Sequence, residues 1–261
     1  MEDPSGRESG EFVRILRSAP EARLRLVCCP HAGASASAYA ALARELPEDI
    51  EVLAVEYPKR RAQSDRGGFT TIEELADLVS AALAPWSGRP LAVYGHSMGS
   101  VVAFEVTRRL EAGGSNVARL FVSGRRSPSD GLGDGLPAND EEIIAELTTL
   151  GGLPPKLLEK PKFLRPILTV IRHDYRSNSS YLAPPDAVVR TPVTFQLADS
   201  DYYVDPAAAE GWRRHTIGDF RVVHVHGGHF FLNERLPQVV EVITADLREA
   251  PTTTAERQAS A

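Results

Sequence analysis

The chain has 261 residues, of which 43% are hydrophobic and 25% are charged, and its formal net charge is −6. This length and apolar content suffice for one α/β domain with an inserted subdomain, and the negative charge argues against nonspecific nucleic-acid binding. No apolar run approaches the roughly 18 residues that span a bilayer, and the N-terminus has no apolar signal segment. We therefore expect a soluble, cytoplasmic monomer with no membrane attachment.

Short apolar runs alternate with amphipathic segments along most of the chain. Such runs are typical of parallel strands buried on both faces, with helices packed against them. The pattern predicts a doubly wound α/β domain with a mostly parallel sheet, built from residues 21–124 and 186–249. The polar ends predict an N-terminal tail and lead-in at 1–20 and a disordered C-terminal tail at 250–261. The expected strands are 24–29, 50–57, 90–94, 117–123, 192–198 and 220–225, and the expected helices are 36–46, 71–83, 98–111, 207–216 and 236–249.

The first expected strand ends in Cys28 and Cys29, the only two cysteines of the chain. Neighbouring residues of a strand point to opposite faces of the sheet. These two therefore cannot form a disulfide framework, and we interpret them as buried apolar thiols rather than as redox groups. No H-E-x-x-H, paired C-x-x-C or P-loop motif is present, so we expect no metal and no cofactor.

The pentapeptide Gly95-His96-Ser97-Met98-Gly99 follows an apolar run and opens a helix-like stretch. This context is typical of a nucleophile elbow, in which flanking glycines keep Cβ atoms out of a tight strand-to-helix turn. Ser97 is the predicted nucleophile. An oxyanion hole needs two backbone donors, and we expect the N–H of Met98 and that of Ala32, which lies in the small-residue loop after the first strand. His31 in that loop has no partner at ligand spacing, which favours a loop-shaping role over a metal ligand or base.

The alternation of strands and helices stops between residues 125 and 185. Helical patterns occur there at 140–150, 155–158 and 163–175, without a convincing strand. We interpret this insertion as a helical lid on the same side as the elbow, and surface decoration is the alternative.

Charges are segregated within this insertion. Residues 129–147 contain six acidic and no basic residues, whereas residues 150–180 contain six basic and two acidic ones. The basic stretch is either a docking surface or an ordinary solvated face.

A serine nucleophile needs a histidine base and a carboxylate that orients it, and elbow-type hydrolases carry them in the order Ser, Asp, His. His229 follows the last expected strand within Gly227-Gly228-His229-Phe230-Phe231, which is the expected place for the base. The acid should follow the strand at 192–198, where Asp199 and Asp201 are both candidates. We favour Asp201, which lies farther into the loop, whereas Asp205 is expected to cap the next helix.

Together these segments resemble type II thioesterases, the stand-alone editing enzymes of polyketide and nonribosomal peptide synthetases, which have the α/β-hydrolase fold. The resemblance covers about residues 23–248. It implies a triad of Ser97, Asp201 and His229 with oxyanion amides at Met98 and Ala32. Two departures are Ala34, where a second glycine is usual, and Lys59-Arg60-Arg61-Ala62, where a Gly-Arg-rich turn is usual. The segments that carry the resemblance are Cys29-Pro30-His31-Ala32-Gly33, Tyr57-Pro58, the elbow with Ala103-Phe104-Glu105, Gly227-Gly228-His229-Phe230-Phe231-Leu232, and the lid pattern from Gly151 to Tyr175.

The resemblance implies hydrolysis of acyl groups from the phosphopantetheine thiol of acyl or peptidyl carrier proteins. Carrier proteins are usually acidic, so basic side chains are candidates for docking them. A chain-releasing thioesterase, a general esterase and a silent acyl-binding protein of the same fold are the alternatives. A start at its own Met without an upstream carrier domain favours a free-standing enzyme. The candidate docking residues are Lys59, Arg60, Lys156, Lys160, Lys162 and Arg165.

Overall fold

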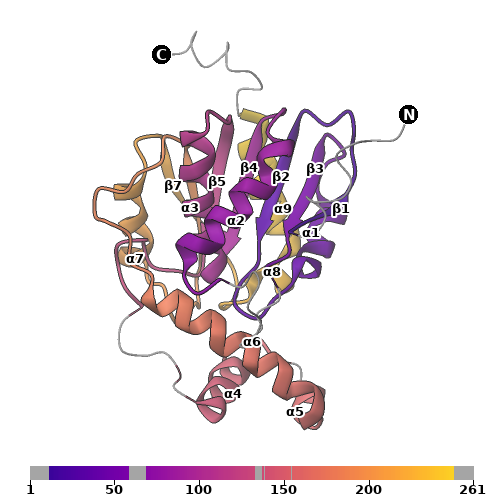
Figure 1. Cartoon of the computed structure of the whole chain (residues 1–261), viewed down its shortest axis with the longest axis vertical. Helices are drawn as coiled ribbons and strands as arrows, with labels where there is room; N and C mark the ends of the chain where they lie inside the picture. The colour runs from indigo at the N-terminus through magenta and orange to yellow at the C-terminus, as the bar shows by residue number, and fades with distance from the viewer. Residues whose placement is uncertain (1–11, 59–68, 133–136, 138, 154, 250–261) are drawn as a thin grey trace.

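The computed structural model describes residues 12–58, 69–132, 137, 139–153 and 155–249. Among these residues, seven strands form one sheet in the order β1-β3-β2-β4-β5-β6-β7 (Figure 1). β1 pairs antiparallel with β3, and every other pair is parallel. The predicted mostly parallel sheet is thus confirmed. The strands are β1 (Val13–Arg17), β2 (Leu24–Cys29), β3 (Ile50–Val55), β4 (Leu91–His96), β5 (Val117–Ser123), β6 (Val193–Ala198) and β7 (Phe220–Val225).

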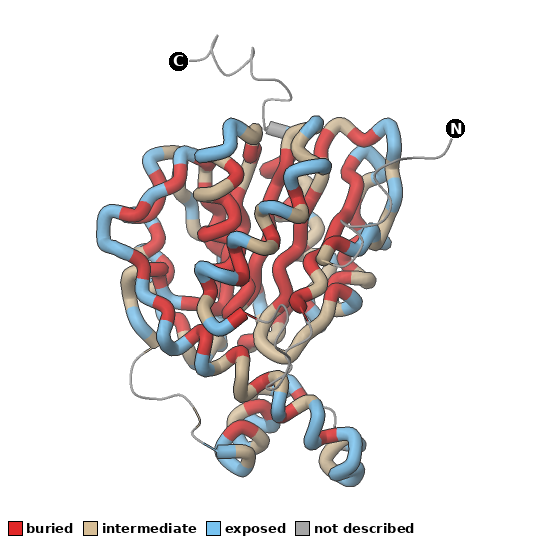
Figure 2. The backbone as a smooth tube through the Cα atoms, in the orientation of Figure 1, coloured by how far each residue is buried: buried red, intermediate tan, exposed pale blue. Residues whose placement is uncertain are grey.

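Helices cover both faces of this sheet. α2 (Ile72–Leu83) and α3 (Met98–Ala112) contribute to one apolar cluster, whereas α1 (Ala40–Glu45) and α9 (Leu236–Glu249) contribute to the other. Cys29 belongs to the first cluster and Cys28 to the second, as the alternation of side chains along a strand predicts. The buried positions follow the strands and the inner sides of the helices (Figure 2). The remaining short helices of the sheet domain are η2 (Ala36–Tyr39), η3 (Ala84–Trp86), α7 (Pro206–Glu210), η4 (Gly211–His215) and α8 (Phe231–Glu234).

The start of α2 shows how the local sequence determines where a helix begins. The Thr71 side chain accepts a hydrogen bond from the Glu74 N–H at 3.2 Å, and the Glu74 carboxylate accepts one in return from the Thr70 N–H. Such reciprocal capping satisfies N–H groups that have no partner inside the helix. The apolar side chains then recur at helical spacing and are buried against the sheet, at Ile72, Leu75, Ala76, Val79 and Leu83.

Three further helices lie between β5 and β6, and we call them the lid helices: α4 (Asp140–Thr149), α5 (Pro155–Leu158) and α6 (Pro161–Ser180). They project from one end of the sheet, where the polypeptide also forms α8 (Figure 1). Their own apolar cluster is separate from the two clusters of the sheet domain and includes Ile143, Leu147, Leu164, Leu168 and Ile171. Within the described ranges, no helix is both long enough and apolar enough to cross a membrane.

Candidate active site

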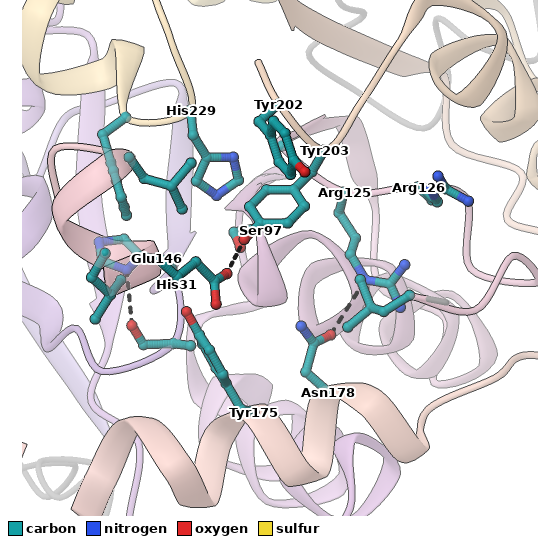
Figure 3. A pocket seen from close by; sticks show the side chains of 16 residues that line it. His31, Ser97, Arg125, Arg126, Glu146, Tyr175, Asn178, Tyr202, Tyr203 and His229 are labelled. Carbon is teal, nitrogen blue, oxygen red and sulfur yellow. Dashed lines mark hydrogen bonds between the residues drawn. The ribbon is translucent and has the colours of Figure 1, made fainter. Parts of the chain in front are cut away.

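The candidate site lies at a reversal of strand order. β2 neighbours β3 on one side and β4 on the other, so the chain leaves the centre of the sheet in both directions. In α/β sheets, ligands bind beyond the carboxyl ends of strands at such a point, because the loops there diverge. A cavity of about 330 Å³ lies there (Figure 3), and its walls include Ala32 after β2, Ser97 after β4, and His229 after β7.

Ser97 has a left-handed backbone, with φ 54° and ψ −126°, and is the only non-glycine residue of the described chain with a positive φ. Such a conformation costs about 1–3 kcal/mol and persists only where its surroundings impose it. The Ser97 N–H donates to the Ser123 carbonyl at 2.8 Å, which ties the turn to β5. The buried Ser100 hydroxyl adds a bond to the same carbonyl at 2.7 Å. These bonds hold the serine at the cavity wall.

The two glycines of the pentapeptide are required by close packing. A Cβ at Gly95 would lie 2.1 Å from the Gly99 carbonyl oxygen. A Cβ at Gly99 would lie 2.1 Å from the Cys29 carbonyl oxygen. The start of α3 therefore lies directly against the end of β2, and this contact brings the nucleophile turn next to the loop that contains Ala32.

Both predicted oxyanion amides lie at this contact. Met98 is the first residue of α3, where backbone N–H groups have no partner inside the helix and the helix dipole is positive. Ala32 lines the cavity from the other side. Neither N–H donates a hydrogen bond to another residue in the part of the chain that the structure describes. The two N–H groups are therefore not committed to hydrogen bonds within the described residues.

His229 and Asp201 form a buried pair. Both carboxylate oxygens of Asp201 lie 3.1 Å from His229 Nδ1, and the two side chains are 4% and 1% exposed. Asp201 also accepts the Tyr203 N–H at 2.9 Å, which fixes the carboxylate. Across the described residues, no hydrogen bond joins the Ser97 hydroxyl to His229, but both line the cavity. A serine hydroxyl rotates freely about one bond, and such contacts often tighten only when substrate binds.

The alternative acid has a different partner. Asp199 accepts from His226 Nδ1 at 2.9 Å, and these side chains are 46% and 74% exposed. The hydrogen bond from His226 lowers the pKa of Asp199. Asp205 caps α7 by accepting the Ala208 N–H at 2.7 Å, which confirms the predicted cap. Of the three carboxylates after β6, the structure thus brings only Asp201 to His229.

His96, next to the serine, packs against His229. Their ring centroids are 4.9 Å apart, and His96 Nδ1 is 2.9 Å from the Ser123 hydroxyl. Burial lowers the pKa of His96 well below its usual value, so the ring beside the base is neutral. Burial likewise raises the pKa of both cysteine thiols, which leaves them without nucleophilic thiolate.

The lid helices contribute cavity residues that the sequence did not indicate. Glu146 of α4 accepts a hydrogen bond from the Tyr203 hydroxyl, and Tyr175 of α6 points its hydroxyl toward the same carboxyl group (Figure 3). Burial raises the pKa of Glu146 to about 7, against a pull in the opposite direction from nearby His229. The sequence shows Glu146 only as one member of an acidic run, and no local pattern links it to Tyr203.

Arg125 is a second unpredicted cavity residue. It is 1% exposed, and burial lowers its pKa to about 10. Its guanidinium donates to Asn178 Oδ1 at 3.3 Å and to the Asp130 carbonyl at 3.2 Å. The bond to Asn178 joins the segment after β5 to α6, so this arginine anchors α6 to the sheet domain.

The candidate docking residues on the lid are all exposed. Lys156 lies on α5, and Lys160, Lys162 and Arg165 lie at the start of α6. No ion pair involves any of these four within the described ranges. Lys59 and Arg60 lie outside the described residues. Among the described residues, no group of three or more His, Cys, Asp or Glu side chains could hold a metal ion.

A family profile described as "Thioesterase domain" matches residues 24–247. The chain belongs to the thioesterase family. It is a thioester hydrolase with the α/β-hydrolase fold, as the sequence predicts. The thioesterase is 38% identical over 250 residues to Thioesterase PikA5 from Streptomyces venezuelae, covering 94% of this chain and 88% of that one.

Solved structures agree with this assignment. The type II thioesterase BorB from the borrelidin biosynthetic cluster superimposes with a TM-score of 0.79 and 36% identity, covering 90% of this chain and 97% of that one. YbtT, a type II thioesterase from the yersiniabactin NRPS/PKS pathway, superimposes with a TM-score of 0.76 and 29% identity, covering 91% and 97%. Two further relatives are longer than the thioesterase, which spans 64% of one and 16% of the other.

Proposed function

We propose that the thioesterase removes acyl groups from the phosphopantetheine thiol of acyl or peptidyl carrier proteins, and so clears stalled or misprimed modules of a polyketide or nonribosomal peptide synthetase. One observation carries the proposal: the strained Ser97 shares a cavity with His229, which is bonded to a buried Asp201. The type II thioesterases that resemble the chain support the choice of substrate.

The chemistry follows from these positions. Ser97 Oγ attacks the thioester carbonyl carbon and transfers its proton to His229, while Asp201 stabilises the imidazolium. The N–H groups of Met98 and Ala32 hold the oxyanion. The carbon–sulfur bond then breaks, and His229 returns the proton to the departing thiol. Water deprotonated by His229 attacks the acyl-enzyme, and the second tetrahedral intermediate releases the carboxylic acid and restores Ser97.

The carrier would dock on the lid helices. Four unpaired basic side chains lie within ten residues of one another there, at Lys156, Lys160, Lys162 and Arg165. Phe163 lies among them in sequence and is 67% exposed, so it adds an apolar ring to this basic surface. A basic surface with an exposed apolar side chain complements an acidic partner, because charge guides the approach and the apolar contact adds affinity.

The proposal is tested with one short acyl group presented in three ways: on a holo carrier protein, on coenzyme A, and as a simple oxygen ester. We expect kcat/KM to be highest for the carrier-bound thioester. Ser97→Ala should lower it by at least about 10³-fold, because the nucleophile is lost.

Each other result points to an alternative. Equal or better turnover of the oxygen ester would indicate a general esterase. Preferential turnover of a full-length chain over the short acyl group would indicate a chain-releasing enzyme. Failure of a phosphonofluoridate to label Ser97, with no turnover of any substrate, would indicate a silent acyl-binding protein.

A further inference from the structure

Lid helix α6 is hydrogen-bonded to the loop that contains Ala32. Asp174 Oδ2 accepts a hydrogen bond from the Gly33 N–H at 2.8 Å, across a separation of 141 residues in sequence. Asp174 is completely buried, at 0% exposed. A hydrogen bond from a backbone N–H to a carboxylate is about twice as strong as one between neutral groups. The contact therefore constrains the loop strongly.

A packing contact on the same face of α6 reinforces this bond. Ile171 precedes Asp174 by three positions, so both side chains lie on one side of the helix. A Cβ at Gly33, which has φ +79°, would lie only 2.5 Å from Ile171 Cγ1. Glycine thus lets α6 approach the backbone of the loop closely. Ile171 restricts the position of the loop by van der Waals contact, and Asp174 restricts it by a hydrogen bond.

The bond acts on the peptide unit next to the oxyanion donor. Gly33 follows Ala32, so a fixed Gly33 N–H restricts rotation of the backbone at Ala32. The two tyrosine bonds to this loop lie before Ala32: Tyr39 donates to the Cys29 carbonyl at 2.9 Å, and Tyr57 donates to the Pro30 carbonyl at 2.7 Å. On the other side of the donor, the bond to Asp174 adds to a turn bond from the Ala34 N–H to the His31 carbonyl at 3.1 Å.

We infer that Asp174 is a positioning residue, which holds the N–H of Ala32 in the oxyanion hole through its bond to Gly33. This inference rests on the proposed function, since it concerns the same site. It makes α6 part of the catalytic apparatus as well as a cover for the cavity. An amide displaced by even about 1 Å stabilises the tetrahedral intermediate poorly, while binding of the acyl chain depends on other walls of the cavity.

The test compares three variants with a small acyl thioester as substrate. Asp174→Ala should lower kcat about 10- to 100-fold with KM within about 2-fold, because the loss concerns the transition state. Asp174→Asn keeps an acceptor oxygen in place and should recover most of this loss. Ser177→Ala is the matched control, because it removes another bond between α6 and the sheet domain, from the Ser177 hydroxyl to the Thr70 carbonyl at 2.9 Å. It should leave kcat unchanged.

A second readout separates positioning from general damage. A trifluoromethyl ketone forms a tetrahedral adduct with the serine, so its affinity reports the oxyanion hole. We expect its dissociation constant to rise in Asp174→Ala by the same factor as kcat/KM falls. If this variant does not fold, Asp174→Ser, whose shorter side chain cannot reach Gly33, takes its place.

The outcomes are distinct. Unchanged kcat in folded Asp174→Ala, or a lower kcat with unchanged affinity for the ketone, would overturn the role of Asp174. Equal losses in Ser177→Ala would also overturn it, because any loosening of α6 would then suffice. If the wild-type protein cleaves no thioester at all, the proposed function itself fails.

Discussion

Two acidic residues only two positions apart have opposite environments. Asp201 is buried against His229, whereas Asp199 is half exposed and bonds His226 at the surface. Asp201→Asn should therefore lower kcat by about 10²- to 10⁴-fold, because the imidazole loses the group that orients it. Asp199→Asn should stay within about 2-fold, as expected for an exposed pair. Steady-state kinetics on one thioester decides between them, and similar losses in both variants would contradict the geometry.

An individual site residue can be predicted from the sequence when it belongs to a short local motif. Ser97 and His229 lie in short glycine-flanked motifs, so their positions were predictable. The preference for Asp201 over Asp199 rests on its position farther into the loop, and the structure brings Asp201 to His229. Glu146 and Asp174 were not predictable as site residues. Their contacts with Tyr203 and Gly33 span 57 and 141 residues and depend on how the lid helices pack.

The same limit applies to the secondary-structure elements. Six strands were predicted from their apolar runs to within two residues, but β1 was not, because it is a short edge strand with mostly exposed or half-buried residues. α6 extends to Ser180, whereas the pattern predicted its end at Tyr175. Its last turn is polar and has weak helix propensity. Tertiary bonds hold it, from Ser177 to Thr70 and from Arg125 to Asn178.

The attachment of α4 to the sheet domain should depend on pH. Glu146 has a pKa of about 7 in the folded protein, whereas an unfolded chain has the ordinary value near 4.5. The folded state therefore keeps a proton that the unfolded state releases, and stability from this group falls as pH rises from about 4.5 to 7. Tyr203, Tyr175 and His229 face this carboxyl group. Glu146→Gln cannot ionise, so its stability relative to wild type should rise between about pH 5 and pH 7 and level off above that.

Chemical denaturation at several pH values measures this difference, and comparison with wild type cancels the other titrating groups. Glu141→Gln is the control, because Glu141 lies exposed on the same helix. Its difference from wild type should stay constant over the same range. A constant difference for Glu146→Gln as well would show that the carboxyl group ionises freely in the folded protein.

At the scale of the whole molecule, the lid helices and the segment between α4 and α5 contact three of the four connections that form the candidate site. Asp174 bonds the loop after β2, and Glu146 bonds Tyr203 in the loop after β6. Gly152 lies against Phe230 in the loop after β7, where a Cβ would approach the ring to 2.5 Å. A movement of these helices would therefore change the site as well as its access. A partner that docks on the lid could thus influence catalysis directly.

Charge distribution offers a test of such docking. The chain as a whole carries −6, yet residues 156–165 contain four exposed basic side chains. Replacing Lys156, Lys160 and Lys162 together by Glu should raise KM for an acyl carrier protein about 10-fold or more, because attraction becomes repulsion. Turnover of a small thioester should change less than about 2-fold, because these side chains do not line the cavity. Added salt should reduce the effect, since exposed charges are screened.

A matched control separates local docking from total charge. Arg14, Arg44 and Arg248 are exposed on β1, α1 and α9, so none of them lies on the lid helices. Replacing these three by Glu changes the net charge by the same amount as the lysine triple variant. If the carrier is recognised through the lid, only the lysine variant should lose affinity for it. Equal rises in KM for both variants would mean that overall charge steers the carrier, and unchanged KM in the lysine variant would remove the lid from its recognition.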